Sequence, residues 1–580
     1  MRLRSRRQRL FSVQSWAFGL TIVGVSYLVL VPLLTLLYAS VRSTEDRLPF
    51  ESTVTTLSNY TLVLTHPASL SILLNTLFFT VGSLAIGLPL AISFAWLMER
   101  SSIPGRSWIS RLILVPMTIP SLLSAIAWIQ LLDPRIGLVN IALRWVPGLG
   151  GETGPLDIYS LGGMCFVQGI RLVPTAYLMI AASFRAMDPS LEEQSAMAGR
   201  NVFQSTMRIT LPIMRPALLG ALIYFVIVVM EAFDIPGLLG FTARIRVLST
   251  AIYWATHSEV GLPDYGLASA LAVVVLALAL VFMWVYHRLT RHQERFATIT
   301  GKGYRPRTIN LGPWTLPAVV LCWLYVLIAV VLPFLILLWT SVQPFYAIPS
   351  AEAFGRATLS GYRNMWQDAT VNRALWNTLL LALVTGGATI FIAVLISWFV
   401  VRRRRQAQRL TGYLGIISFL PQGIPSIVIG LALIFVYIRF PIPIYGTLWI
   451  IALGLMTRYM AFSSRTTIGA MIQVHGELEE ASQMAGAGWG RTMRQITAPL
   501  LLPAMINAFL WVAVHAMQEL SMALMLYNPD SVVVSTLIWS MWQNGKTDEA
   551  AVLGVVLILL SGVLLFGGQG YAYVRGRYGH

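Results

Sequence analysis

Hydrophobic positions along this chain fall into long runs separated by short polar or basic segments. A helix needs about 20 apolar residues to cross a bilayer, and the runs are of that length. They predict twelve membrane helices, six in each half of the chain. The expected spans lie near 14–39, 70–98, 108–132, 159–184, 214–240, 265–288, 313–341, 373–401, 412–438, 446–470, 501–527 and 549–574. We therefore expect an all-α, polytopic membrane protein.

Composition and charge placement support a membrane protein with a defined orientation. A chain that is 56% hydrophobic and only 11% charged does not fit a soluble globular protein. The net charge of +17 could suggest nucleic acid, but more than half of the 41 lysines and arginines fall in the termini, the central linker and loops on one side. This bias predicts that both termini are cytoplasmic and that the basic groups meet lipid, not nucleic acid.

A repeated segment divides the chain into two similar halves. Leu191–Ala217 and Leu478–Ala504 match at a constant offset of 287, since 478 minus 191 is 287. Further pairs, such as Asn75 with Asn377, extend the repeat across the chain. An even number of spans per half predicts two parallel repeats related by an axis along the membrane normal. The expected repeats are 1–300, with a core at 60–290, and 301–580, with a core at 360–570.

The repeated segment is a polar insert between spans, and it predicts a short amphipathic helix. Two glutamates lie near its start, where they complement the helix dipole, a glycine ends it, and a proline leads back to the membrane. An ordinary surface helix at the lipid headgroups is one interpretation. Recurrence at one spacing favours the other, a docking element for a soluble partner. The residues concerned are Glu192, Glu193, Ala198, Gly199 and Pro212, and in the second copy Glu479, Glu480, Ala485, Gly486 and Pro499.

These inserts resemble the signature of permease subunits of binding-protein-dependent ABC importers. That signature is Glu-Ala-Ala, three residues, Gly, nine residues, then Ile-x-Leu-Pro. The first copy is Glu193-Gln194-Ser195, Gly199, Ile209 and Leu211-Pro212, and the second is Glu480-Ala481-Ser482, Gly486, Ile496 and Ala498-Pro499. Several alanines and one leucine are replaced, but every spacing is kept. The resemblance implies a type I ABC importer permease fold in which each insert is a coupling helix for an ATP-hydrolysing subunit.

The chain itself lacks the motif that would bind ATP. No G-x-x-x-x-G-K-[ST] segment is present to hold phosphates. The resemblance therefore implies a transport subunit that is not an enzyme and has no cofactor of its own. ATP and Mg²⁺ would be bound by two copies of a partner ATPase. It also implies one extracytoplasmic binding protein and a location in a prokaryotic inner membrane. The direction of transport, into the cell, is likewise implied by the resemblance.

Weaker sequence similarities bear on the identity of the substrate. The stretches SSIPGRSW from Ser101, EAFDIPGLLG from Glu231 and QELSMALMLY from Gln518 are similar to the fused ferric-iron branch of these permeases. Thiamine, aminoethylphosphonate and polyamine importers have related permeases and stay as alternatives. A twelve-span secondary transporter is a further alternative, although it has no need of two matched docking inserts.

Charged residues inside the predicted spans mark a candidate substrate pathway, because such groups are costly in lipid and often functional. Arg171 and Glu231 are placed at equal depth, as are Arg458 and Glu519. We expect ion pairs within each half, Arg171–Glu231 and Arg458–Glu519. Alternatively, Glu231, Asp234 and Glu519 line the pathway, where carboxylates would suit a hard cation. His515 shares a helix face with Glu519, and helix packing is the favoured role for it over metal binding.

Overall fold

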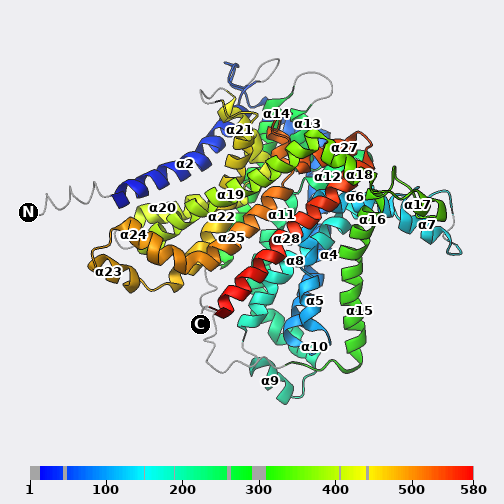
Figure 1. Ribbon diagram of the computed structural model, residues 1–580, viewed down its shortest axis with the longest axis horizontal. Helices are drawn as coiled ribbons and strands as arrows, with labels where there is room; N and C mark the ends of the chain where they lie inside the picture. Colours follow the sequence, from blue (N-terminus) through cyan, green and yellow to red (C-terminus); the bar gives the residue numbers. More distant parts are fainter. Residues whose placement is uncertain are drawn as a thin grey trace, which may run out of the picture.

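The computed structural model describes residues 13–43, 49–148, 151–187, 190–257, 263–290, 308–403, 407–438 and 443–578. Within these ranges the chain is built from helices, and the only extended pairings are two isolated bridges. Figure 1 shows the helices gathered into two arms that join in the upper part of the view. The expected all-α polytopic fold is confirmed.

The first half supplies six membrane-crossing elements and several shorter helices. The crossing elements are α2 (Val13–Ser40), α4 (Pro67–Arg100), α5 (Arg106–Leu112) with η1 (Val115–Thr118) and α6 (Ser121–Leu132), α8 (Leu161–Ala186), α11 (Leu211–Met230) and α14 (Tyr265–Thr290). The shorter elements are α3 (Ser58–Thr65), α7 (Leu138–Arg144), α9 (Ser190–Met197), α10 (Val202–Ser205), the π-helical η2 (Thr206–Thr210), α12 (Asp234–Ala243) and α13 (Leu248–Thr256).

The second half repeats this order. Its long elements at the matching places are α15 (Thr315–Val326) with η5 (Leu327–Val331) and α16 (Leu332–Ser341), α19 (Ala369–Arg402), α20 (Gln408–Phe419) with η6 (Leu420–Gly423) and α21 (Ser426–Tyr437), α22 (Leu448–Gln473), α25 (Ala498–Gln518) and α28 (Thr547–Tyr578). The shorter elements are η4 (Gly312–Trp314), α17 (Ala351–Arg356), α18 (Ser360–Gln367), α23 (Glu477–Met484), α24 (Trp489–Thr492), η7 (Met493–Thr497), α26 (Ser521–Leu526) and α27 (Val534–Gln543). The bounds of α8 and α22 differ by 287 at both ends, which confirms the predicted repeat.

Two of the predicted spans in each half differ from simple crossings. The third span of each half is broken, with bends of 97° at Pro120 and 110° at Pro425. The fifth spans, expected to reach residues 240 and 527, end early at Met230 and Gln518. An acidic residue, Glu231 or Glu519, follows each helix end, and the chain turns there into separate short helices although the sequence stays largely apolar. The described residues contain nine helices long and apolar enough to cross a membrane, or up to twelve when each bent pair counts as one span. The bent pairs include α12 with α13, whereas α22, in the predicted fourth span of the second half, is not among the twelve.

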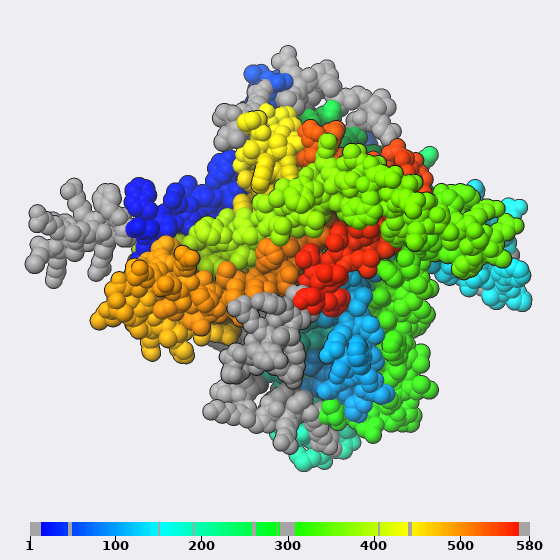
Figure 2. All heavy atoms as spheres, viewed as in Figure 1, coloured from blue at the N-terminus to red at the C-terminus, as the bar shows by residue number. Residues whose placement is uncertain are grey.

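The first crossing helix of each half packs on the other half. Phe18 of α2 packs against Phe399 of α19, with ring centroids 4.9 Å apart, and α2 also contacts α20 and α21. In return, Thr340 of α16 donates a hydrogen bond to the Gln130 side chain of α6 at 2.9 Å. Figure 1 shows α2 beside α20 and α15 beside α5, and Figure 2 shows the same contacts as blue against yellow-green and green against blue. The two repeats are therefore interlocked by an exchange of helices.

Candidate functional site

In the first half, α9 is fastened to the membrane helices through Glu192. Arg100, the last residue of α4, is fully buried, and its Nε lies 3.6 Å from Glu192 Oε2. Thr210 donates its hydroxyl to Glu192 Oε1 at 2.7 Å. Arg100 also donates to the carbonyls of Phe184 and Met187, at the end of α8. One buried arginine thus joins α4, α8 and α9, and the carboxylate compensates its charge.

The second half repeats this arrangement with closer contacts. Arg402, the last residue of α19, donates from Nε to Glu479 Oε1 at 3.1 Å. Thr497 donates to the same oxygen at 3.2 Å, and the Trp398 indole donates to the other oxygen at 3.0 Å. A carboxylate with three charge-assisted or polar partners is held more firmly than one with two. The α23 connection is therefore the stronger of the two.

The remaining surface of each insert helix is open. Glu480 follows the buried Glu479 by one residue and is exposed, whereas Glu193 is partly exposed. Met197 is 81% exposed and Met484 is 90% exposed, at the last positions of α9 and α23. Each insert helix therefore turns one glutamate inward and leaves a methionine exposed at its last position.

Glycines end both insert helices with the geometry that their position predicts. Gly199 has φ +79° and Gly486 has φ +85°, in the left-handed region that favours glycine. A Cβ at either position would meet nothing within 4 Å, so backbone conformation, not space, is the constraint. After each insert the chain forms a π-helical turn, η2 or η7, directly before the long helix that carries Pro212 or Pro499. Such turns are frequent at functional sites.

Sequence reasoning missed the anchoring residues, although the repeat contains the signal. Arg100 and Arg402 are separated by 302, the offset that relates the second spans, and Thr210 and Thr497 are separated by 287. A polar residue that recurs at the repeat offset next to a recurring glutamate is a candidate partner for it. Trp398 also recurs, as Trp96, but only Trp398 donates a hydrogen bond to the insert glutamate, since the Trp96 indole nitrogen has no hydrogen-bond partner in the described structure.

A second site lies between the two halves, where the fifth span of each ends. A cavity of about 190 Å³ is lined by Glu231, Asp234, Arg171, Arg458 and Glu519. Glu231 is the residue that ends α11, and Asp234 begins α12. The pathway residues expected from sequence, His515 aside, are therefore brought together around one space.

The expected ion pairs within each half are wrong. Arg458 of α22 donates from Nη2 to Glu231 Oε1 at 2.6 Å and from Nη1 to Glu231 Oε2 at 3.2 Å. The pair therefore crosses from the second half to the first. Glu519, the partner expected for Arg458, instead accepts from the Tyr459 hydroxyl at 3.2 Å. Equal depth gave no information on which of two facing carboxylates an arginine would meet.

Arg171 has a different environment from Arg458. It forms no ion pair with Glu231 in the described part of the chain, and the acidic group that acts on it is Asp234. Both arginines share one contact: Arg171 donates to the carbonyl of Ile119 at 2.7 Å and Arg458 to that of Ile424 at 2.9 Å. These carbonyls precede Pro120 and Pro425, at the breaks of the third spans. Each arginine therefore satisfies a backbone acceptor that the bend leaves outside the helix.

His515 packs and does not face the carboxylates. Its Nδ1 lies 2.8 Å from the Trp511 carbonyl, and its ring stacks on the Trp511 indole at 3.9 Å. Among the residues that the structure describes, no three His, Cys, Asp or Glu side chains are placed to hold a metal ion together. The cavity is a charged chamber with arginines and carboxylates, and its geometry is not that of a closed metal cage.

Comparison with known proteins assigns the family. The model of the binding-protein-dependent transport system inner membrane component matches residues 87–295 and again 389–575. The chain belongs to this family. Each match begins inside the second crossing helix, so the exchanged helices α2 and α15–α16 lie outside the part of the permease that the family shares.

Proteins similar to this permease are named as permeases of transport systems. The chain is 23% identical to the Fe(3+)-transport system permease protein FbpB 2 of Haemophilus influenzae, over 96% of this chain and 99% of that protein. It is 26% identical to the ferric transport system permease protein FbpB of Actinobacillus pleuropneumoniae over 70% of this chain, and spans 58% of that protein's length. A putative 2-aminoethylphosphonate transport system permease protein PhnV of Salmonella typhimurium is 26% identical over 33% of this chain and 73% of its own length.

A solved structure is similar to part of the permease. A bacterial ABC transporter that imports the acidic polysaccharide alginate matches 45% of this chain and 96% of its own, with 17% identity and a TM-score of 0.36.

Proposed function

We propose that this permease forms the channel of an ATP-driven importer, and that α9 and α23 are its two coupling helices. The observation that carries the proposal is the matched anchoring of Glu192 and Glu479 to the terminal arginines of α4 and α19. A helix that is fixed on one face and open on the other transmits a push from a soluble partner to the spans behind it. Because there are two such helices, two copies of a separate ATPase dock on the permease, and these subunits bind ATP and Mg²⁺.

The charged cavity is the proposed path between the halves. Its walls come from both repeats, and the Arg458–Glu231 pair closes it across the interface. In this mechanism, ATP binding moves α9 and α23, the halves rearrange, and that ion pair breaks and re-forms. A binding protein delivers substrate on the side opposite the insert helices, and both termini are on the ATPase side of a prokaryotic inner membrane.

Ferric iron is the proposed substrate. Full-length similarity to fused Fe(3+) permeases supports this choice, and three carboxylates near one cavity suit a hard trivalent cation in passage. 2-Aminoethylphosphonate is the second candidate, since a PhnV relative aligns over 33% of the chain and the cavity also holds two arginines.

Reconstitution tests the function. The permease is placed in liposomes with the ATPase and binding protein encoded beside it, and uptake of ⁵⁵Fe(III) and of labelled 2-aminoethylphosphonate is measured with ATP inside. We expect ATP-dependent uptake of iron that the phosphonate does not compete. Uptake driven by an ion gradient without an ATPase would contradict the importer mechanism, and phosphonate uptake without iron uptake would contradict the substrate.

A further inference from the structure

A large pocket lies in the first repeat, away from the insert helices. Its volume is about 1220 Å³, and it is bounded by the starts of α4 and α14 and by α12 and α13. The α4 residues that line it, from Ala68 to Asn75, lie at the far end of that helix from Arg100. The pocket is therefore separate from both the α9 anchor and the charged cavity between the halves.

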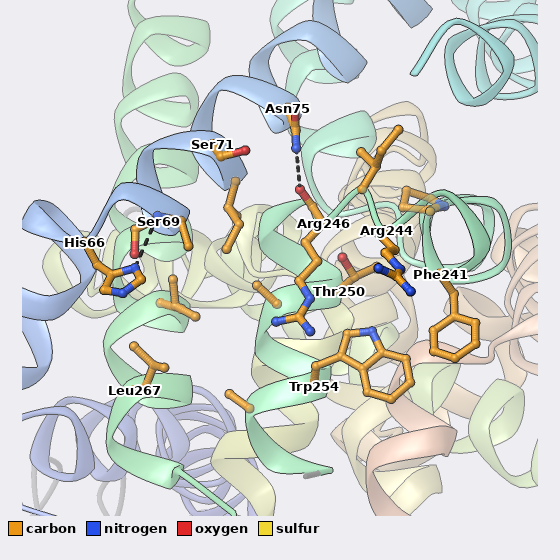
Figure 3. Close-up of a pocket in the computed structure, with 18 of the residues that line it drawn as sticks. His66, Ser69, Ser71, Asn75, Phe241, Arg244, Arg246, Thr250, Trp254 and Leu267 are labelled. Atoms are coloured by element: carbon orange, nitrogen blue, oxygen red, sulfur yellow. Dashed lines mark hydrogen bonds between the residues drawn. The ribbon is translucent and has the colours of Figure 1, made fainter. Parts of the chain in front are cut away.

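Two arginines enter this pocket without a compensating carboxylate. Figure 3 shows the Arg244 and Arg246 side chains near Thr250, on the side of the pocket that holds Trp254. No residue that lines the pocket is acidic, and no ion pair involves either arginine within the described structure. Two guanidinium groups in one pocket attract an anion, and their planar donors match phosphate or carboxylate oxygens.

The second repeat has the same backbone frame but a different charge arrangement. Asn75 donates to the Arg246 carbonyl, and its counterpart Asn377 donates to the carbonyls of Asp530 and Val532. At these offsets Arg244 corresponds to Asp530, and Ser71 corresponds to Arg373. In the second repeat Arg373 and Asp530 form an ion pair at 2.9 Å. The positive pocket is therefore specific to the first repeat and is not a consequence of the shared fold.

The surroundings place this pocket at the edge of the membrane. The exposed face of α4 beside it is apolar and includes Leu70, Leu74 and Phe78. The repeat counterpart of Leu74 is Trp376, which is 68% exposed. Exposed tryptophans are enriched where the bilayer meets water. The arginines therefore lie near headgroup level, and the lipid-facing surface of α4 continues into the pocket wall.

We propose that this pocket binds one anionic glycerophospholipid, with its phosphate on Arg244 and Arg246. An acyl chain would pack on the apolar wall formed by Ile72, Leu267 and Leu271. A free phosphate offers the same charge but leaves that wall uncovered, so the apolar lining favours the lipid. α12 begins at Asp234, which lines the charged cavity. A lipid held at the other end of α12 therefore stabilises the position of this helix beside that cavity.

Lipid retention by the purified full-length chain tests the proposal. Delipidated protein is mixed with micelles containing phosphatidylglycerol or phosphatidylcholine, and bound lipid is counted by native mass spectrometry. We expect one phosphatidylglycerol to bind in preference to phosphatidylcholine. The double variant R244S/R246S should weaken that binding roughly thirtyfold, because each arginine near a charged surface contributes about a factor of five.

The control is R373S, which removes an arginine of the second repeat outside the pocket. It should leave lipid retention unchanged, and both variants should keep the thermal midpoint of the parent. Equal retention of phosphatidylglycerol by R244S/R246S and the parent overturns the proposal. Binding of inorganic phosphate that depends on the arginines, without a preference for phosphatidylglycerol, also overturns it and identifies a free anion as the ligand. If R244S/R246S loses only its association with the binding protein, the pocket is a protein contact and the proposal is likewise overturned.

Discussion

Glu231 of the first repeat accepts two hydrogen bonds from the Arg458 guanidinium of the second, at 2.6 and 3.2 Å. Arg458 also donates to the carbonyl of Ile424, at the break of its own third span. The arginine is therefore held by one contact inside its repeat and by a bidentate contact across the interface. A motion that separates the two repeats at this level has to break the contact across the interface and can keep the one inside.

Removing the charge of Glu231 should slow transport without preventing assembly. Glu231→Gln keeps the shape and one acceptor but leaves Arg458 without its partner charge. We expect reduced substrate uptake in liposomes, with ATPase binding unchanged in a pull-down. Glu519→Gln should also reduce uptake, since Glu519 lines the same cavity. Normal uptake by both variants would reject a role for these carboxylates in the pathway.

A double-mutant cycle should detect the pairing across the repeats. In thermal unfolding of the purified chain, Glu231→Gln and Arg458→Gln should show a coupling free energy of about 1–3 kcal/mol, as is usual for residues in contact. The matched control is Glu231→Gln with Arg171→Gln, the pair expected from sequence, which should couple more weakly. A larger coupling with Arg171 would contradict the observed contact.

The anchor of α23 should be more sensitive than that of α9. Glu479→Gln removes the charge that Arg402, Trp398 and Thr497 share, and a hydrogen bond to a charged group contributes about 1.5–3 kcal/mol. We expect a lower thermal midpoint and ATP hydrolysis that no longer drives full uptake. Glu192→Gln should have a smaller effect, because Arg100 lies farther away at 3.6 Å. Glu480→Gln is the control: an exposed residue should affect ATPase docking but not stability.

The glycines at the ends of the insert helices should tolerate asparagine better than valine. At φ near +80° an ordinary L-residue costs roughly 1–2 kcal/mol, and asparagine costs less. Gly199→Val and Gly486→Val should therefore weaken ATPase retention and uptake, whereas the asparagine variants keep most of both. Gly490→Ala, which changes an exposed glycine with negative φ, serves as the control. Equal activity of the valine and asparagine variants would show that the left-handed turn is unimportant.

Close packing of α4 on α8 should make Gly87 intolerant of a methyl group. A Cβ there would lie 2.6 Å from the Gly169 carbonyl oxygen, a backbone atom that cannot yield without moving the helix. Overpacking of this kind costs about 1–3 kcal/mol, so Gly87→Ala should lower the thermal midpoint clearly. A Cβ at Gly387 of α19 would meet no atom within 4 Å, and Gly387→Ala should therefore be neutral or stabilising. A neutral Gly87→Ala would contradict the observed helix contact.

Orientation can be measured with single cysteines in the native background, since Cys165 and Cys322 are buried. Met484→Cys at the end of α23 and Trp145→Cys after α7 place thiols at residues that are 90% and 86% exposed. In intact cells an impermeant maleimide should label Trp145→Cys and not Met484→Cys. The reverse pattern would contradict the predicted cytoplasmic location of the inserts.

Much of the architecture could be predicted from the chain because it depends on local or repeated features. Apolar run length located the crossing helices, and α22 lies close to the expected 446–470. The recurring glutamate, glycine and proline located both inserts and their turns. What failed was span length at Glu231 and Glu519, because apolar residues such as Ile235 continue past the helix end and only the tertiary packing makes α12 a separate helix.

The sequence by itself determined the membrane class, the duplication, the two inserts and the set of charged residues near mid-span. Only the tertiary structure decided that Glu231 pairs with Arg458, that Glu192 and Glu479 turn inward, and that α2 and α16 pack on the opposite repeat. Periodicity and repeat offsets specify which residues are equivalent and how deep they lie. They do not specify which helices are neighbours, and neighbours decide which charges meet when each must find a partner in a low-dielectric interior.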